Sequence, residues 1–396
     1  MTRPSNPQIL IIGGGVIGNA IAYFLSLDPG LRDQIVVVER DPTFRTASTA
    51  LSAASIRTQF SNALNVQISK FGAEFIRNFS GLFSQADPGP DLEFRENGYL
   101  FLAGTQEQAA LIRENHAIQS AAGADVILLE PAAIRDRFGY LNTSDLRLGA
   151  LGVRGEGWFD NMGLHGGLRR LAKGQGARFV TDEVVGFDMA DRRLVAARMA
   201  SGERLVAGEF INAAGPRAAA LARLAGVALP IEARKRTTFA FQTPEPPPPD
   251  APLMVDPTGF YVRPERDFWI GACQPDPDPM VDADDFTPTY AEFDETLWPG
   301  LAARSPLFEA MKFRRAWAGH YAYNVLDQNA VLGRHPEVDN LIFANGFSGH
   351  GLQQAPAVGR GIAELIRFGR YTSLDLAPLG YERIISGRPF NERNVV

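Results

Sequence analysis

The sequence contains one cysteine, few histidines and no long apolar run. Cys273 is the single cysteine, so a disulfide cannot form within the chain. The five histidines lack the HExxH spacing of a zinc site, and we predict no metal site. No segment approaches the roughly 20 consecutive apolar residues that a membrane-spanning helix needs, so we expect no membrane span.

The beginning of the chain and its net charge bear on the expected cellular location and on binding to nucleic acid. The stretch after Met1 enters an apolar strand within a few residues, without the long apolar region and small-residue cleavage site of a signal peptide. With a single cysteine, these features predict a reducing, cytoplasmic location. The net charge of −6 disfavours binding to nucleic acid.

What is present is an ordinary globular composition. Of the 396 residues 45% are hydrophobic and 21% are charged, which is enough apolar material for a large core. The length predicts about two domains. Composition alone does not indicate an activity.

The first forty residues predict a strand, a helix and a second strand. Ile9–Ile12 and Ile35–Val38 are short apolar runs, as expected for parallel strands covered on both faces, and Ala20–Leu27 is helical in character. The helix then crosses over between two parallel strands, and such crossovers are right-handed almost without exception.

A glycine fingerprint lies between the first strand and this helix. Gly13, Gly15 and Gly18 form GxGxxG, in which the glycines allow a tight turn, a close approach of the backbone to a pyrophosphate and close helix–strand packing. The phosphates bind at the helix N-terminus. Glu39 ends the second strand, where an acid accepts hydrogen bonds from an adenosine ribose. The motif predicts a dinucleotide site but does not separate FAD from NAD.

The rest of the chain alternates strands and helices. We expect exposed connections at 243–256, which contains four consecutive prolines, and at 274–290. Further elements are predicted at Val126–Leu129, Met162–Lys173, Phe179–Val185, Phe210–Gly215, Pro216–Ala225, Leu341–Ala344 and Ala355–Phe368. Nucleotide-type elements at both ends indicate one domain assembled from distant segments, with a second inserted between them.

Four ordered segments carry a resemblance to a known family. They are the fingerprint with Glu39, Thr46–Ser52, Ile211–Gly215 and Gly346–Gly351. In this order the chain resembles the D-amino-acid oxidase-like family of FAD-dependent oxidoreductases, over nearly its whole length. The C-terminal turn is similar to the sarcosine oxidase and dehydrogenase branch.

Two branches of the family share further segments with this chain. Gly346–Glu364 and Trp317–Gly319 look like the mitochondrial FAD-dependent oxidoreductase domain-containing proteins, whereas Arg234–Thr237 and Phe260–Pro264 look like D-arginine dehydrogenase. The resemblance implies an α/β fold with additional helices. It has a Rossmann-like FAD-binding domain of the glutathione-reductase/p-hydroxybenzoate-hydroxylase type and a mixed-sheet substrate domain. We expect the FAD-binding domain at 1–90, 145–228 and 330–396, and the substrate domain at 91–144 and 229–329.

The resemblance also implies which residues contact FAD. Hydroxyls and backbone N–H groups of the early loop lie near the pyrophosphate and ring, a central valine binds adenine through its backbone, and the C-terminal turn faces the flavin N1–C2=O edge, where negative charge develops on reduction. The expected cofactor residues are Gly13, Gly15, Val16, Ile17, Gly18, Glu39, Arg40, Ser48, Thr49, Ser52, Val184, Ala214, Gly215, Gly346, Gly349, His350, Gly351 and Leu352.

The implied reaction is hydride transfer to flavin from the carbon next to an amine nitrogen, followed by hydrolysis of the imine. A guanidinium is a suitable clamp for a substrate carboxylate. Monomeric sarcosine oxidases carry a lysine after the C-terminal turn, where this chain has Gln353, so Arg57 and Arg236 are the remaining candidate clamps. An ion pair at the surface or in a flavin loop is the alternative for both arginines.

Other substrate-site residues follow from the same alignment. Tyr261 matches an active-site tyrosine of D-arginine dehydrogenase, and Tyr321 falls where that enzyme has a carboxylate-binding arginine. His320 aligns with the cysteine that anchors covalent FAD, so we expect non-covalent FAD, with Cys273 as a buried strand residue. Core packing is the alternative for Tyr321, Tyr261 and His320.

Three functional hypotheses remain open. The first is oxidation of a small amine or an N-alkyl or D-amino acid, with an unidentified electron acceptor. Trp269 at the position of an oxygen-activating lysine favours a dehydrogenase over an oxidase. The second is a flavin-bearing subunit of a multi-subunit oxidoreductase, and the third a non-catalytic FAD-binding assembly factor. A homo- or hetero-oligomer is compatible with each.

Overall fold

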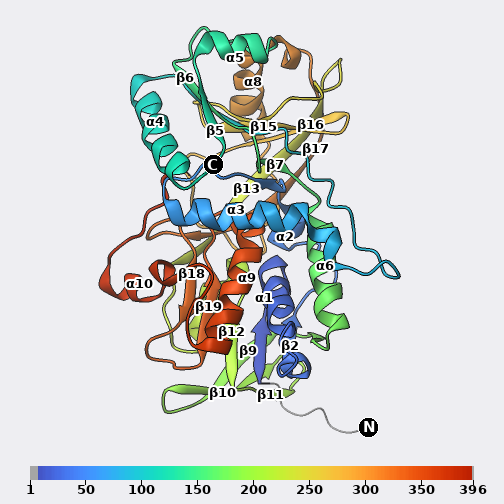
Figure 1. Ribbon diagram of the computed structural model, residues 1–396, viewed down its shortest axis with the longest axis vertical. Helices are drawn as coiled ribbons and strands as arrows, with labels where there is room; N and C mark the ends of the chain where they lie inside the picture. The colour runs from blue at the N-terminus through green and yellow to red at the C-terminus, as the bar shows by residue number, and fades with distance from the viewer. Residues whose placement is uncertain (1–7, 395–396) are drawn as a thin grey trace.

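The computed structural model describes residues 8–394 and arranges them as two parts stacked along the long axis (Figure 1). The lower part is built on a six-stranded sheet in the order β18-β19-β12-β1-β2-β8. Five strands are parallel, and β18 runs antiparallel to β19. The strands are β1 (Ile9–Ile12), β2 (Ile35–Glu39), β8 (Arg178–Thr181), β12 (Glu209–Asn212), β18 (Val331–Arg334) and β19 (Leu341–Asn345).

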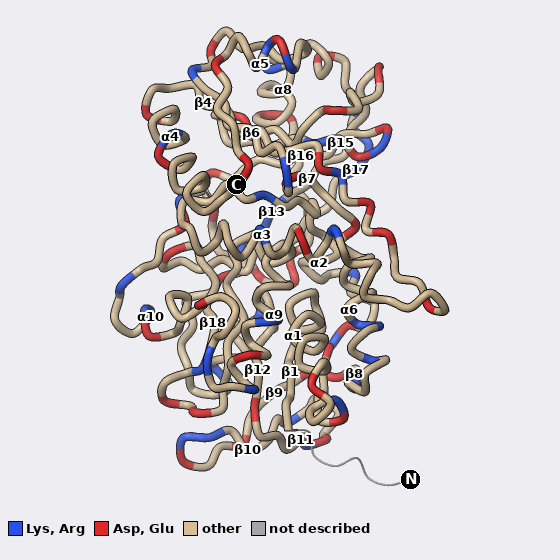
Figure 2. Tube along the Cα trace, in the orientation of Figure 1, with Lys and Arg blue, Asp and Glu red and all other residues tan. Residues whose placement is uncertain are grey.

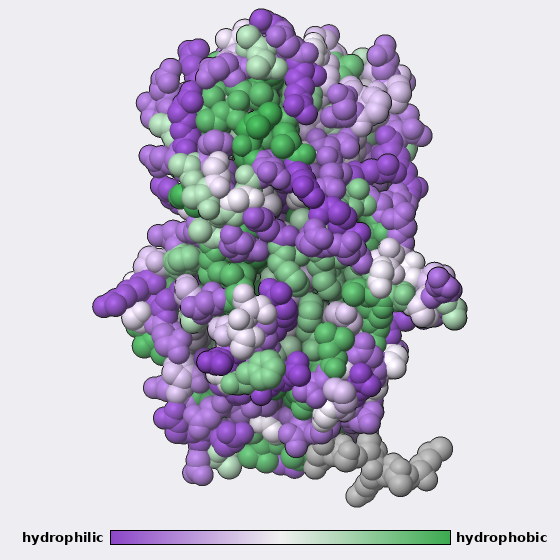
Figure 3. Space-filling view, in the orientation of Figure 1, coloured by the Kyte–Doolittle hydropathy of each residue, from purple (hydrophilic) through white to green (hydrophobic). Residues whose placement is uncertain are grey.

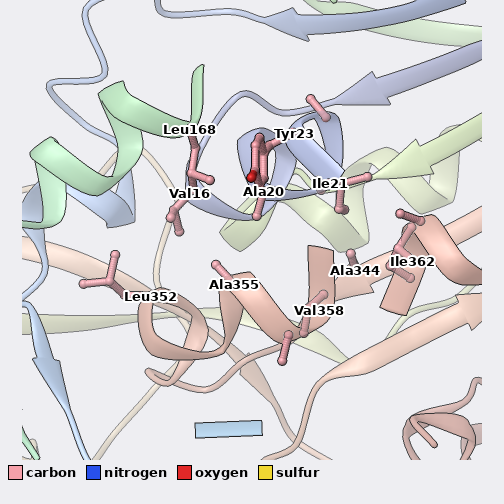
Figure 4. Packing of buried hydrophobic residues seen from close by; sticks show 14 of the residues in the cluster. Val16, Ala20, Ile21, Tyr23, Leu168, Ala344, Leu352, Ala355, Val358 and Ile362 are labelled. Carbon is pink, nitrogen blue, oxygen red and sulfur yellow. The ribbon is translucent and has the colours of Figure 1, made fainter. Parts of the chain in front are cut away.

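Three helices cover one face of this sheet: α1 (Val16–Ser26), α6 (Asn161–Gly174) and α9 (Gly351–Phe368). The helices α1 and α9 pack side by side with small residues between them, and Figure 4 shows their apolar side chains pointing toward one another. A Cβ on Gly359 would lie 2.7 Å from the backbone carbonyl carbon of Ala20. The close approach of these helices therefore depends on the absence of a side chain at Gly359.

The upper part contains an eight-stranded mixed sheet in the order β17-β13-β16-β15-β14-β4-β6-β5. Its core holds large aromatic side chains, among them Trp269, Phe239 and Phe308. The strands are β4 (Tyr99–Ala103), β5 (Val126–Leu129), β6 (Leu148–Gly152), β13 (Ile231–Gln242), β14 (Leu253–Val255), β15 (Phe260–Glu265), β16 (Phe268–Cys273) and β17 (Lys312–Asn324).

The remaining elements connect or cover the two large sheets. Helix α3 (Ala63–Arg77) lies at the junction and packs against α9 (Figure 1). The other strands are β3 (Ser55–Ile56), β7 (Gly157–Trp158), β9 (Val184–Ala190), β10 (Arg193–Met199) and β11 (Arg204–Val206). The other helices are α2 (Ser48–Leu51), α4 (Gln106–Ala121), α5 (Pro131–Arg137), α7 (Ala218–Leu224), α8 (Trp298–Arg304) and α10 (Glu382–Ser386).

The predicted fold class is confirmed: a Rossmann-like unit assembled from distant segments accompanies a mixed-sheet part. Several element boundaries differ from expectation. The segment 243–256 ends in the buried strand β14, 179–185 spans the end of β8 and the start of β9, and β12 ends at Asn212. The strand β6 pairs with β4 and β5 in the upper sheet, beyond the expected domain boundary at 145.

Charged residues of both signs are distributed over both parts of the molecule (Figure 2). Among residues 8–394 no helix has the length and apolarity needed to cross a membrane. Within the same range no group of three or more His, Cys, Asp or Glu side chains is placed to hold a metal ion.

The α1–α9 contact gives a first testable prediction. We expect Gly359→Val to lower the free energy of unfolding by about 1–3 kcal/mol, because the new side chain must displace the backbone of α1. Chemical denaturation measures the change. Gly166→Ala in α6 is the matched control: a Cβ there meets nothing within 4 Å, so the better helix former should leave stability unchanged or raise it. Equal losses in both variants would contradict the packing argument.

Candidate cofactor and active site

A cavity of about 520 Å³ lies between the two parts of the chain. Its lower wall is formed where β1, β2 and β12 end, and its upper wall by residues of β13, β15 and β17. Ligands of open α/β sheets bind outside the carboxyl ends of the strands. The cavity therefore occupies the position that the glycine fingerprint predicts.

The three fingerprint glycines are required for different reasons. Gly13 has a φ of +109°, and a Cβ there would lie 2.3 Å from the Ala213 carbonyl oxygen. A Cβ on Gly18 would lie 1.9 Å from the Gly13 carbonyl oxygen. Gly15 lines the cavity, and the protein atom nearest to its Cβ position is Thr49 Oγ1, at 3.5 Å. Close protein neighbours therefore leave no room for a side chain at Gly13 or Gly18. The space beside Gly15, by contrast, suits a pyrophosphate that approaches the backbone.

The side chain of Glu39 is fixed beside this turn. Its Oε2 accepts a hydrogen bond from the Gly14 amide at 2.8 Å, and its Oε1 accepts one from the Asp41 amide at 2.9 Å. From the other side, His165 Nε2 lies 3.0 Å from the Gly14 carbonyl oxygen. Burial lowers the pKa of His165, so the ring is neutral and donates through Nε2. Glu39 is held where it can accept from ribose hydroxyls, and His165 is a support that sequence reasoning missed.

Two helix N-termini open into the same cavity. The N-cap residues of α1 and α9 are Gly15 and His350, neither helix has a side-chain cap, and neither has an acidic residue in its first turn. Val16 at the start of α1 and Leu352 at the start of α9 line the cavity. The Val16 amide already donates to Thr49 Oγ1, and the positive dipole ends of both helices favour anionic groups there. The open glycine turn, the fixed carboxylate and these two helix ends fit FAD, with its diphosphate and its electron-accepting ring.

The structure brings most of the predicted cofactor residues to the cavity. The exceptions are Gly18, which supports the turn, and Gly346, whose φ of +73° and close contact with Ile231 give it a structural role. Three predicted hydroxyls already have protein partners. Ser48 Oγ donates to the His320 carbonyl at 2.7 Å, Thr49 Oγ1 accepts from the Val16 amide at 3.1 Å, and Ser52 Oγ accepts from the Ala54 amide at 3.0 Å.

Arg57 reaches the upper end of the cavity and is almost fully buried. Its guanidinium donates to the Gln59 carbonyl at 2.6 Å, to His350 Nε2 at 2.9 Å and to the Asn394 carbonyl, and it lies 4.6 Å from the Phe60 ring centroid. Within residues 8–394 no carboxylate forms an ion pair with Arg57. Because a guanidinium has five N–H bonds, two remain for a ligand.

Arg236 is in a different electrostatic state. Its Nη1 and Nη2 donate to the two carboxylate oxygens of Asp278, each at 2.8 Å. Burial by itself would lower the pKa of Arg236, but the hydrogen bonds that Arg236 donates to Asp278, together with the negative charge of that carboxylate, contribute to a pKa that is raised overall. Arg236 also stacks over the Tyr321 ring, 4.8 Å from its centroid. Its guanidinium is already held in a direct ion pair, so of the two predicted clamps Arg57 is the better suited to a carboxylate.

Tyrosines and the start of α9 complete the upper wall. Tyr99, Tyr261 and Tyr321 all line the cavity, and burial raises the pKa of each phenol, so all three are neutral. Tyr99 was missed because an aromatic residue in an apolar strand carries no separate sequence signal. Gln353 Oε1 accepts a hydrogen bond from the Arg57 amide at 2.8 Å, so Gln353 positions Arg57.

The two histidines at the cavity are both neutral. Burial, and to a lesser extent the charge of Arg57, hold the pKa of His350 well below its usual range, so Nε2 accepts from Arg57. Burial also lowers the pKa of His320, whose buried Nε2 has no hydrogen-bond partner within the described residues. The ring of His320 packs against Phe286 with centroids 4.7 Å apart.

The connection 274–290 contributes to the site, which its composition did not predict. Ala283 and Phe286 line the cavity, and Asp284 pairs with Arg40 at 3.2 Å and with Arg217. The segment therefore ties the two parts of the chain together across the cofactor end of the cavity.

Two residues invoked in the sequence comparison lie outside the main cavity. Trp269 is buried in the upper core and donates to Thr243 Oγ1 at 3.1 Å, so it does not mark a position beside the flavin. Cys273 is buried on β16, as predicted, and burial raises the pKa of its thiol to about 12.

Comparisons with known proteins agree with this geometry. Residues 8–365 match the profile of a family described as FAD dependent oxidoreductase. The chain is 39% identical to FAD-dependent oxidoreductase domain-containing protein 1 of Bos taurus, over 99% of this chain and 88% of that protein. It is 23% identical to mitochondrial sarcosine dehydrogenase of Mus musculus, over 93% of this chain and 40% of that protein. The solved structure of L-proline dehydrogenase from P. horikoshii superposes with a TM-score of 0.86 at 26% identity, covering 98% of this chain and 100% of that one.

The different roles of Gly15 and Gly18 can be tested directly. We expect Gly15→Ala to weaken FAD binding at least about tenfold while the unfolding free energy of the FAD-free protein changes by less than about 1 kcal/mol, since a Cβ fits the protein there. Gly18→Ala should destabilise the FAD-free protein itself, because its Cβ collides with the Gly13 carbonyl. Flavin titration and chemical denaturation provide the two measurements. Undiminished FAD affinity in Gly15→Ala would refute the pyrophosphate assignment.

Proposed function

Because the chain belongs to the family of FAD-dependent oxidoreductases, we propose that it oxidises the C–N bond of a small amine or of an N-alkyl or D-amino acid. The observation that carries the proposal is Arg57, a buried cation at the cavity that forms no direct ion pair with a carboxylate among the described residues. FAD, when bound, accepts a hydride from the carbon next to the amine nitrogen. The resulting imine is hydrolysed by water.

The residues of the upper wall bind and orient the substrate. Arg57 attracts a substrate carboxylate by its charge and donates to it through one of its remaining N–H bonds. The neutral phenols of Tyr99, Tyr261 and Tyr321 form an aromatic wall that excludes water and supplies no charge to stabilise an ammonium. A neutral amine, the reactive form, is thereby favoured at the site.

Two finer features belong to the same proposal. Cys273 lies outside the main cavity, which supports non-covalent FAD. An electron acceptor other than oxygen is part of the proposal; sarcosine dehydrogenase and L-proline dehydrogenase are named for this, whereas other similar proteins are named oxidases. We also propose a cytoplasmic location, which cell fractionation would test.

A flavin-bearing subunit of a larger complex, or a non-catalytic assembly factor, is the second candidate. Figure 3 shows apolar surface on the upper part of the molecule. Among the described residues, Ile127 on the edge strand β5 is 37% exposed, and Phe313 on β17, at the opposite edge of the same sheet, is 41% exposed. Exposed apolar surface of this kind is compatible with a protein partner.

Anaerobic bleaching of the flavin absorbance separates these candidates. We expect bleaching by one class in a panel of amines, N-methyl amino acids, cyclic amino acids and D-amino acids, and a slow return of colour in air. Dithionite provides the control that the flavin is bound and reducible. If dithionite bleaches the flavin and no compound does, the subunit or non-catalytic alternative is favoured.

The clamp assignment predicts a selective kinetic defect. Arg57→Ala should raise KM for carboxylated substrates by about 10–150-fold, the loss of a charged hydrogen-bonded contact worth about 1.5–3 kcal/mol, and should change KM for simple amines far less. Arg236→Ala is the comparison variant, and its effect should not depend on a substrate carboxylate. Equal losses for both substrate classes in Arg57→Ala would exclude the clamp.

A further inference from the structure

A second ionisable group lies buried behind Arg57. Glu156, in the connection between β6 and β7, has 0% exposure. Its Oε1 accepts from the Thr58 amide at 2.8 Å and contacts Thr58 Oγ1 at 2.5 Å, and its Oε2 accepts from Gln59 Nε2 at 2.8 Å. A Cβ on Gly152 would lie 2.0 Å from the Glu156 carboxyl carbon, so the chain leaves room for this group.

Glu156 is linked to the clamp through the backbone. The Gln59 carbonyl that accepts from Arg57 Nη1 belongs to the residue whose side chain donates to Glu156. Within residues 8–394 no lysine or arginine forms an ion pair with Glu156. The charged or titratable groups around it are Arg57 and the neutral phenol of Tyr99, and His350 faces Arg57 from α9. Arg57 is therefore the cation that compensates a charge on Glu156.

Two opposing influences act on the pKa of Glu156. Burial raises this pKa above its usual value, and the hydrogen bonds from Thr58 and Gln59 and the positive charge of Arg57 offset only part of the rise. A buried carboxylate without a compensating cation is unfavourable and becomes protonated. A ligand that neutralises Arg57 removes the compensation.

We propose that Glu156 is a positioning residue that balances the charge of Arg57 in the free site and takes up one proton from solvent when a substrate carboxylate binds. The inference rests on the proposed clamp role of Arg57. The Thr58 hydroxyl suits both states, because it donates to the ionised carboxylate and accepts from the protonated acid. On binding, the substrate carboxylate replaces the ionised Glu156 as the anion that balances Arg57. The buried site therefore never holds a net negative charge.

This coupling makes carboxylate affinity depend on pH. Above the free-site pKa of Glu156, each pH unit should weaken the binding of a carboxylate tenfold, since a proton must be taken up with the ligand. A neutral ligand of the same shape should bind with no such dependence. Carboxylated substrates are thus favoured toward lower pH by the protein itself.

Isothermal titration calorimetry of the FAD-loaded, oxidised protein tests the proposal. The probe is pyrrole-2-carboxylate, which is small and flat, has no saturated C–N carbon to oxidise and carries no basic amine. Its neutral control is pyrrole-2-carboxamide. Binding enthalpies in phosphate and in Tris, which differ in ionisation enthalpy, give the number of protons taken up. We expect a value approaching one for the carboxylate at pH 8 and near zero for the carboxamide.

Two variants identify the residue that takes up the proton. Glu156→Gln keeps the shape and an acceptor oxygen, and it should bind the carboxylate without proton uptake and with an affinity that no longer falls with pH. His350→Asn should retain the uptake. Uptake that persists in Glu156→Gln and disappears in His350→Asn would overturn the proposal.

If Glu156→Gln does not fold, calorimetry of the wild-type protein still tests the proposal. Selective binding of the carboxylate over the carboxamide without proton uptake between pH 6 and 9 overturns the role of Glu156 and leaves the clamp intact. Absence of that selectivity overturns the Arg57 clamp and this inference with it.

Discussion

The contact between α1 and α9 is the constraint on which the rest of the site depends. These helices lie more than 300 residues apart in the chain, yet Gly359 brings α9 against the backbone of Ala20. The contact sets both helix N-termini at one cavity, so two positive dipole ends face the same ligand. A diphosphate and an electron-accepting ring need positive ends at two places, and a single helix supplies only one.

The upper wall of the cavity depends on the same arrangement. The first turn of α9 carries His350 and Gln353, and these residues hold Arg57 through its guanidinium and its backbone amide. The clamp is therefore built on the helix that also faces the cofactor, which fixes the substrate end of the site relative to the flavin end. Arg236, on β13, has its charge balanced by Asp278 and takes part in the wall instead.

Much of the cofactor end could be predicted from sequence because its determinants are local. The turn Gly13–Gly18, the apolar strands on either side and Glu39 at the end of β2 lie within about thirty residues, and their spacing by itself implies the geometry. The family resemblance then located most of the remaining cavity residues. Element boundaries were less predictable: β14 lies in a segment whose prolines indicate a loop, and β6 joins the upper sheet by pairing with β4.

By itself the sequence determined the dinucleotide fingerprint, the order of the strands and helices and the identity of the candidate cations. Only the tertiary structure decided which cation is available, because that depends on partners far away in the chain. Asp278, which pairs with Arg236, lies 42 residues from it in the sequence, and His350, which accepts from Arg57, lies 293 residues away. The same holds for Glu156, an ordinary acidic residue in sequence, whose burial and whose contacts with Thr58 and Gln59 exist only once β7 pairs with β3. Charge balance in a buried site is a property of the whole fold, since it is set by which groups share a low-dielectric environment.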